Sequence, residues 1–369
     1  MKKLLVVGLI VLLSAFAFAG KLSFTGSVDV TPWVEFGLTP SSFQATGAAF
    51  GKCLSWWLQG VAASDYGYFY FYFTSTGIEV PSWGGAYIET PLVEATDVTL
   101  VMRGGRFGVS QSAASGGRIY VDGWGGCSWT GSDCESDCNK FWNKDPRIRD
   151  VEYYDIANML ILDYKDALTI NTVLALCGNT LDATDTNNLC LDLDVYMKML
   201  VLDPVYLFVD LHDLGTTPYL VLMGSLDAGK EAGFPLGFAA KVKVEGLAGA
   251  PKVAAWDVGG WFDFSDPLSV YWKLSGTDIS TSSFDGVVTV SGIEMLKGDW
   301  DFGVDFSFAD GTFTLVDFGF TGAYSHIKDS EISYYPGILV TLPNGEEQTT
   351  ATIDLWCTAE FTFELPTGE

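Results

Sequence analysis

Residues 353–365, which read Ile-Asp-Leu-Trp-Cys-Thr-Ala-Glu-Phe-Thr-Phe-Glu-Leu, alternate apolar and polar side chains. Every odd position is apolar, and Trp356 is the only even position that is neither polar nor charged. A two-residue period is that of a β-strand with one apolar and one polar face. Strands of globular proteins usually have ~5–6 residues, whereas a tilted strand needs ~9–11 residues to cross a bilayer. The segment therefore predicts a membrane-spanning strand.

The same alternation recurs through most of residues 21–365 and is clearest after residue 151. Short turns near 165–166, 203–204 and 266–267 alternate with longer polar loops near 178–188 and 276–285, as in an up-and-down barrel. Pro32 cannot donate a ladder hydrogen bond, so the first alternating stretch is one bent strand or two. We predict an all-β fold: a single-domain, antiparallel transmembrane β-barrel of about 16–18 strands over residues 20–369.

The first third of the mature chain is less regular. Residues 66–73 place tyrosines on one face of a strand and phenylalanines on the other, which fits a lined interior and lipid, or burial between the two sheets of a soluble protein. Residues 77–124 predict only short strands, near 98–103 and 118–123. Residues 123–149 show no alternation but contain cysteines and tryptophans, which predicts a long ordered loop.

The N-terminal residues predict export. Lys2 and Lys3 precede an apolar run from 4 to 13, and residues 17–19 form a small-residue cleavage site before Gly20. We therefore expect a signal peptide over residues 1–19 and a mature protein in the outer membrane of a bacterial cell envelope.

Composition agrees with this assignment. The chain is 48% hydrophobic and only 18% charged, yet no run of eighteen apolar residues follows residue 20. A membrane barrel distributes its apolar residues in this way, over alternate positions. The net charge of −26 argues against a nucleic-acid partner. It reflects solubility or habitat, or it favours cations inside a pore.

In a closed sheet of about sixteen strands the interior holds water, so the mid-strand charged residues would line the lumen. In a soluble sandwich the same residues would face outward while the apolar faces met. The predicted lumen-facing residues are Asp192, Asp194, Lys198, Lys241, Lys243, Glu245, Asp257, Asp301 and Asp305.

With its signal peptide, alternating strands and terminal strand, the chain resembles the bacterial outer-membrane β-barrels, and among them the porins. Phe361, Phe363 and Leu365 resemble the C-terminal signal read by the barrel-assembly machinery, although four further residues follow here. The resemblance implies outer-membrane lipid, small hydrophilic solutes and cations as partners, and it allows a homotrimer.

All five arginines lie between positions 103 and 149. Together with the loop at 123–149 they resemble the arrangement by which porins narrow the lumen. That resemblance implies a constriction in which Arg103, Arg106 and Arg118 face acidic residues. The alternative is that they are ordinary surface-loop arginines.

Few residues suggest other chemistry. Cys177 and Cys190 bracket a polar loop between neighbouring strands, which predicts a disulfide. We expect no metal and no cofactor, since the cysteine spacing is not that of a zinc site and the acidic loop at 182–188 lacks the full calcium-binding pattern. His212 with Asp210 or Asp213 could imitate a hydrolase site, but no catalytic motif is present and we expect no enzyme.

The sequence thus favours a porin-like channel for passive diffusion of ions and small hydrophilic solutes, with an acidic, cation-preferring lumen. Two alternatives stay open: a plugged structural or adhesive envelope barrel, and a secreted, soluble all-β protein that binds carbohydrate through its aromatic residues.

Overall fold

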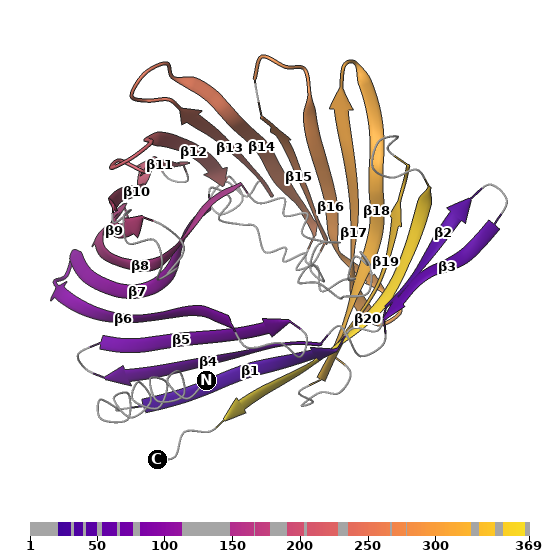
Figure 1. The fold of residues 1–369 in the computed structure, drawn as a ribbon, viewed down its shortest axis with the longest axis horizontal. Helices are drawn as coiled ribbons and strands as arrows, with labels where there is room; N and C mark the ends of the chain where they lie inside the picture. The colour runs from indigo at the N-terminus through magenta and orange to yellow at the C-terminus, as the bar shows by residue number, and fades with distance from the viewer. Residues whose placement is uncertain are drawn as a thin grey trace.

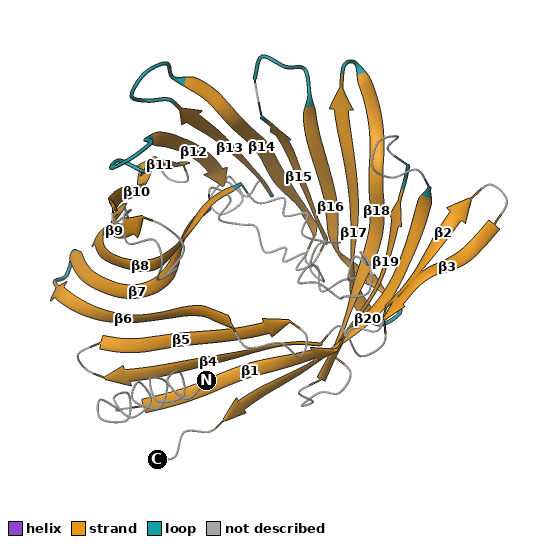
Figure 2. Cartoon of the chain, in the orientation of Figure 1, coloured by secondary structure: helices purple, strands orange, loops and turns teal. Residues whose placement is uncertain are grey.

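A computed structural model describes residues 21–30, 33–39, 42–49, 54–64, 67–76, 82–112, 148–165, 167–177, 190–202, 205–227, 235–265, 268–277, 279–325, 332–343 and 350–365. Every regular element in these ranges is a β-strand (Figure 2). The strands are β1 (Lys21–Val30), β2 (Trp33–Thr39), β3 (Ser42–Ala49), β4 (Leu54–Ser64), β5 (Gly67–Thr76), β6 (Ser82–Glu94), β7 (Val98–Ser112), β8 (Arg149–Tyr164), β9 (Leu168–Cys177), β10 (Cys190–Leu202), β11 (Val205–His212), β12 (Tyr219–Asp227), β13 (Leu236–Glu245), β14 (Lys252–Ser265), β15 (Leu268–Gly276), β16 (Phe284–Met295), β17 (Gly298–Ala309), β18 (Thr312–Ser325), β19 (Ile332–Thr341) and β20 (Ala351–Leu365).

The strands form one antiparallel sheet that closes on itself (Figure 1). From β4 to β20 each strand pairs with its neighbour in the chain, and β20 then pairs with β1 in the register Phe24 opposite Leu365. Closure removes the two free edges that a bilayer could not satisfy with hydrogen bonds. The predicted antiparallel barrel is confirmed.

Two strands of the barrel are each described as two consecutive segments. β1 pairs with the C-terminal half of β20 and β2 with its N-terminal half, so β1 and β2 follow one another along the same neighbour. β3 and β4 likewise follow one another beside β2 and β1. The described segments therefore make an 18-stranded barrel, the upper bound of the range predicted from the sequence. Pro32, where the sequence predicted a bend or a break, lies outside the described residues, and the register on β20 is the same on both sides of it, with Val30 opposite Ala359 and Trp33 opposite Trp356.

The two faces of the sheet differ, as the two-residue period requires. On β9, Val173 is fully buried whereas Leu174 is 46% exposed. The exposed large apolar residues include Leu160, Leu193 and Leu222 on β8, β10 and β12. An apolar outer face of this kind suits the hydrocarbon of a bilayer, because exposing these side chains to water would cost free energy. No helix in the described ranges is long and apolar enough to cross a membrane.

Most short connections lie at one end of the barrel and most longer ones at the other. Exceptions include the two-residue β17–β18 turn, which lies with the longer connections, and the eight-residue β12–β13 connection, which lies with the short turns. The connections β8–β9, β10–β11, β14–β15 and β16–β17 are turns of two or three residues at one end. β9–β10, β11–β12, β13–β14 and β15–β16 are joined by longer connections at the other end. The register of β1 on β20 places Lys21 and Leu365 together at the short-turn end. We refer to the opposite end as the long-loop end.

Four strands differ from the sequence-based expectation. β3 and β6 were not predicted, and β7 is a 15-residue strand rather than a short one. Its alternation is hidden by Gly104, Gly105 and a bulge between Gly105 and Phe107. β16 was also missed: it begins at Phe284, inside the predicted loop, and turns into β17 at Leu296 and Lys297, both with positive φ.

Candidate functional site on the inner wall

The first residues of β8 lie against the inner wall of the barrel, and we call residues 148–154 the β8 entry. Ile148 packs in one cluster with Phe208, Val221, Met223 and Ala239 from β11, β12 and β13. Strands so far along the sheet can be reached only across the concave side, and Figure 1 shows the start of β8 inside the ring. The β8 entry therefore narrows the interior near the long-loop end.

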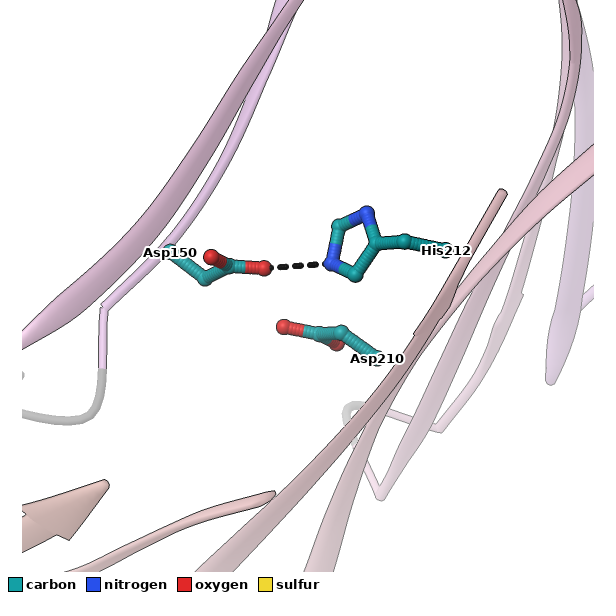
Figure 3. Close-up of side chains that lie close together, drawn as sticks. All are labelled: Asp150, Asp210 and His212. Atoms are coloured by element: carbon teal, nitrogen blue, oxygen red, sulfur yellow. Dashed lines mark hydrogen bonds and ion pairs between the residues drawn. The ribbon is translucent and has the colours of Figure 1, made fainter. Parts of the chain in front are cut away.

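Successive even residues of the β8 entry hold it to the wall. Asp150 accepts a 2.7 Å hydrogen bond from His212 Nε2 on β11, with the proton placed on that nitrogen (Figure 3). Glu152 accepts a 2.9 Å hydrogen bond from the Tyr219 hydroxyl on β12. The Tyr154 hydroxyl contacts Asp194 on β10. The two-residue period of β8 places all three on one face.

His212 is held between two aromatic rings. Its imidazole stacks on Tyr219 at 4.5 Å between centroids and 11° between planes. Tyr196 meets it edge-on at 5.1 Å. The carboxylate of Asp210, two residues earlier on the same face of β11, lies close to both His212 and Asp150 (Figure 3). The sequence pairs His212 with Asp210 or Asp213, and the structure adds Asp150 from a strand distant in the chain. Among the described neighbours of His212 there is no serine or cysteine that could act as a nucleophile.

A second acidic group lies nearby, where β10 begins and β11 ends. Asp192, Asp194 and Asp213 bring carboxylate oxygens within 4.8 Å of one another. The backbone amides of Leu193 and Gly215 bond to Asp192, and that of Asp213 bonds to Asp194 at 2.6 Å. Burial raises the pKa of Asp213 to about 7, assisted by a hydrogen bond to Asp192 and by its charge. Backbone amides thus balance part of this negative charge.

Cations complete the inner wall on β13 and β14. Lys241 Nζ lies 2.7 Å from Asp257 and donates a 3.0 Å hydrogen bond to the carbonyl of Arg149. It therefore ties the β8 entry to β13. Lys243 lies 3.2 Å from Glu245 and 4.0 Å above the Tyr219 ring. These contacts bring together four of the predicted lumen-facing residues with Arg149, the last of the five clustered arginines.

Two of the three predicted constriction arginines line one pocket. Arg103 forms a 2.7 Å ion pair with Glu89 on the adjacent strand β6 and lies 4.5 Å from the centroid of the Tyr87 ring. Arg106 occupies the bulge of β7 and lines the same pocket of about 190 Å³ with Tyr70 and other residues of β5–β7. The acidic partner of Arg103 comes from a neighbouring strand rather than from across the lumen. Arg118 and most of the 123–149 loop lie outside the described residues.

The other predicted site residues are placed as follows. Asp305 is buried on β17, and Asp301 accepts a 3.4 Å hydrogen bond from the Gly292 amide. Lys198 lies 5.0 Å above the Tyr206 ring. Contact of these groups with lumen water stays a prediction. Phe361, Phe363 and Leu365 end β20 beside β1, and their recognition in assembly is not tested. The predicted signal peptide at 1–19 lies outside the described residues.

Cys177 and Cys190 stand directly opposite each other as the last residue of β9 and the first of β10. Opposed residues of antiparallel strands have Cα atoms ~4.5–5.5 Å apart, within the range that a disulfide spans. The predicted disulfide stays a prediction, because only the backbone register is described at these positions.

Comparison with known proteins gives structural matches only. Neither a protein-family model nor a curated protein sequence matches the chain. The outer membrane protein OprD from Pseudomonas aeruginosa matches with a TM-score of 0.54 at 7% identity, covering 94% of this chain and 95% of OprD. The chain has the fold of an outer-membrane β-barrel. Wzi, an Escherichia coli outer membrane protein involved in group 1 capsule assembly and described as a carbohydrate-binding β-barrel, matches this porin-like barrel with a TM-score of 0.50 at 11% identity over 95% and 87% of the two chains.

The sequence missed the apolar part of this inner wall. Val173, Val221 and Met223 are buried on the inner face although their strands also carry apolar residues outside. A strand that is apolar on both faces shows no alternation, so the pattern could not assign these residues to the interior. Of the residues at this site that the sequence pattern missed, Asp150 alone could have been noticed, because it is an acidic residue at the start of a strand.

Proposed function

We propose that this porin-like barrel lies in the outer membrane and lets ions and small hydrophilic solutes diffuse through a water-filled, cation-preferring lumen. The observation that carries the proposal is closure: a single 18-stranded sheet with an apolar outer face leaves an interior wider than its side chains fill. The fold shared with OprD supports it.

Cation preference follows from the charges on the inner wall near the β8 entry. Eight carboxylates take part in the contacts described there, against three lysines. A low-dielectric wall with excess negative charge raises the local concentration of cations. The carboxylates are Asp150, Glu152, Asp192, Asp194, Asp210, Asp213, Glu245 and Asp257, and the lysines are Lys198, Lys241 and Lys243.

Planar-bilayer recording of the purified protein tests this function. We expect stepwise conductance and, in a tenfold KCl gradient, a reversal potential whose sign shows potassium passing more readily than chloride. Addition of detergent alone is the control. A protein that inserts but conducts no current would contradict the channel and favour the plugged envelope barrel. The apolar cluster beneath the β8 entry would then be part of the plug.

A further prediction concerns the arginine pocket. Arg103→Gln leaves the Glu89 carboxylate without its ion-pair partner, and Arg106→Ala removes a second positive charge from the same pocket. If the pocket borders the conducting path, each variant should shift the reversal potential further toward cation selectivity.

The control for this prediction is Lys165→Gln, which removes a cation from the exposed β8–β9 turn, where Lys165 pairs with Asp97. Its reversal potential should equal that of the wild type. Unchanged selectivity in both arginine variants would remove the constriction role.

A further inference from the structure

The Asp150, Asp210 and His212 side chains form a mixed nitrogen and oxygen cluster between the β8 entry and β11. One ligand atom from each residue lies within 4.8 Å of the other two. Figure 3 shows the carboxylates of Asp150 and Asp210 directed toward the same imidazole edge. The cluster is enclosed, because Asp210 is fully buried and His212 is 1% exposed.

Asp210 is the unexplained member of this cluster. Neither of its carboxylate oxygens makes a hydrogen bond of ordinary geometry with a described residue, although the Asp150 carboxyl and the Met197 backbone amide lie nearby. A buried carboxylate without a partner is costly, and here a second carboxylate lies beside it. Lys241 is held by Asp257 and the Arg149 carbonyl, so among the described residues His212 is the basic group that faces both acids. The arrangement calls for a positive group between the two acids.

We propose that Asp150, Asp210 and His212 bind one divalent transition-metal cation, such as Zn²⁺. One imidazole nitrogen with carboxylate oxygens suits zinc and its neighbours in the first transition row, whereas calcium and magnesium prefer oxygen alone. Three protein ligands leave a fourth position for water or a solute group.

The geometry needs little change to accept the ion. Zinc bound at 2.0–2.2 Å to nitrogen and oxygen holds two ligand atoms roughly 3.4 Å apart at a tetrahedral angle. His212 Nε2 and Asp150 Oδ2 are 2.7 Å apart, so they separate by about 0.7 Å as the metal replaces the imidazole proton. The rings of Tyr219 and Tyr196 already fix the plane of the imidazole.

The site would join two parts of the chain that are distant in sequence. Asp150 belongs to the β8 entry, while Asp210 and His212 belong to β11, three strands along the sheet. A bound ion would therefore clamp the β8 entry to the inner wall at the long-loop end. This goes beyond diffusion through the lumen and does not depend on it, since a plugged barrel could bind the ion equally well.

The neighbouring acidic trio, Asp192, Asp194 and Asp213, does not carry the same inference. Its carboxylates already receive backbone amides, and Asp194 also contacts the Tyr154 hydroxyl. It contributes no nitrogen ligand. The trio instead supplies the matched control for the experiment.

The test is zinc binding to EDTA-treated, detergent-solubilised protein, measured by isothermal titration with ZnCl₂ and by metal analysis after desalting. We expect one zinc per chain. Asp210→Asn, His212→Gln and Asp150→Asn should each weaken binding about a hundred-fold or more, exceeding the 10–100-fold effect of losing an outer-shell partner. Asp192→Asn should bind as the wild type does.

Cu²⁺ as a second probe should show coupling to one nitrogen in its electron paramagnetic resonance spectrum, which His212→Gln should abolish. Asp150 is the most accessible of the three and starts a strand, so Asp150→Asn keeps the test valid if a buried variant does not fold. Wild-type affinity in Asp150→Asn, the absence of stoichiometric zinc, or loss of zinc only in Asp192→Asn would each overturn the proposal.

Stability separates a metal site from a purely structural proton between the carboxylates. Zinc should raise the melting temperature of the wild type and not that of Asp210→Asn. In EDTA, Asp210→Asn should melt no lower than the wild type, because it removes a buried charge without removing a described hydrogen bond. A lower melting temperature of Asp210→Asn in EDTA, with no zinc effect on the wild type, would assign Asp210 to structure alone.

Discussion

Exchanging Met197 and Lys198 on β10 should destabilise the protein by about 2–4 kcal/mol in phospholipid bilayers, the cost of a lysine on the lipid face near the midplane of a membrane barrel. The exchange keeps composition and net charge constant. Lys198 lies on the inner face, above Tyr206, and Met197 lies on the outer face one residue away. Denaturant titration in short-chain phosphatidylcholine vesicles, followed by heat-modifiable gel mobility, measures the change.

Lys198→Met alone is the control, because it removes the inner lysine without placing a charge outside. It should cost less than about 1 kcal/mol, the usual value of an exposed cation–π contact. If the exchanged variant were as stable as Lys198→Met, the outer face would be solvated by water. A soluble all-β protein would then be the better description of the chain.

Lys241→Met should have the second largest effect on stability, about 2–3 kcal/mol. The change leaves Asp257 without its 2.7 Å partner and removes the hydrogen bond to the Arg149 carbonyl. Both side chains of the pair are mostly buried, so the charge left behind is poorly solvated. Unfolding followed by tryptophan fluorescence in detergent micelles measures the loss.

The matched variant is Lys243→Met, two residues along the same strand and on the same face. Its pair with Glu245 is more exposed, so we expect a cost of about 1 kcal/mol or less. Adding Asp257→Asn to Lys241→Met should recover part of the stability by removing the unpaired charge. Equal costs for the two lysine variants would show that the tether between β13 and the β8 entry contributes nothing.

The barrel was predictable because its physics is local. A strand between lipid and water must alternate, and the period is visible in any window such as 353–365. Where a strand departs from that rule the prediction failed. Gly104 and Gly105 have no side chain to place in either environment, so β7 seemed short. The strand β16 was not predicted because its first residue, Phe284, lies inside the segment predicted as a polar loop.

The candidate site was only half visible. Asp210 and His212 are two residues apart on one strand, which the sequence alone placed on a common face. Asp150 is 62 positions from His212 and reaches it because the start of β8 bends across the interior. No pattern of apolar and polar residues encodes that bend. The apolar contacts of Ile148 with three strands stabilise it, and they form only once those strands are assembled into the curved sheet.

The contact of β20 with β1 has a consequence for how the chain assembles. Most other strand pairs join neighbours in the sequence, so they have low contact order and can form progressively. Among the described strand pairs, only the seam of β20 with β1 and β2 waits for the whole polypeptide. Loop-closure entropy grows slowly with length, by roughly 0.6 kcal/mol per doubling, so this last step is set less by chain length than by the readiness of both exposed edges to meet.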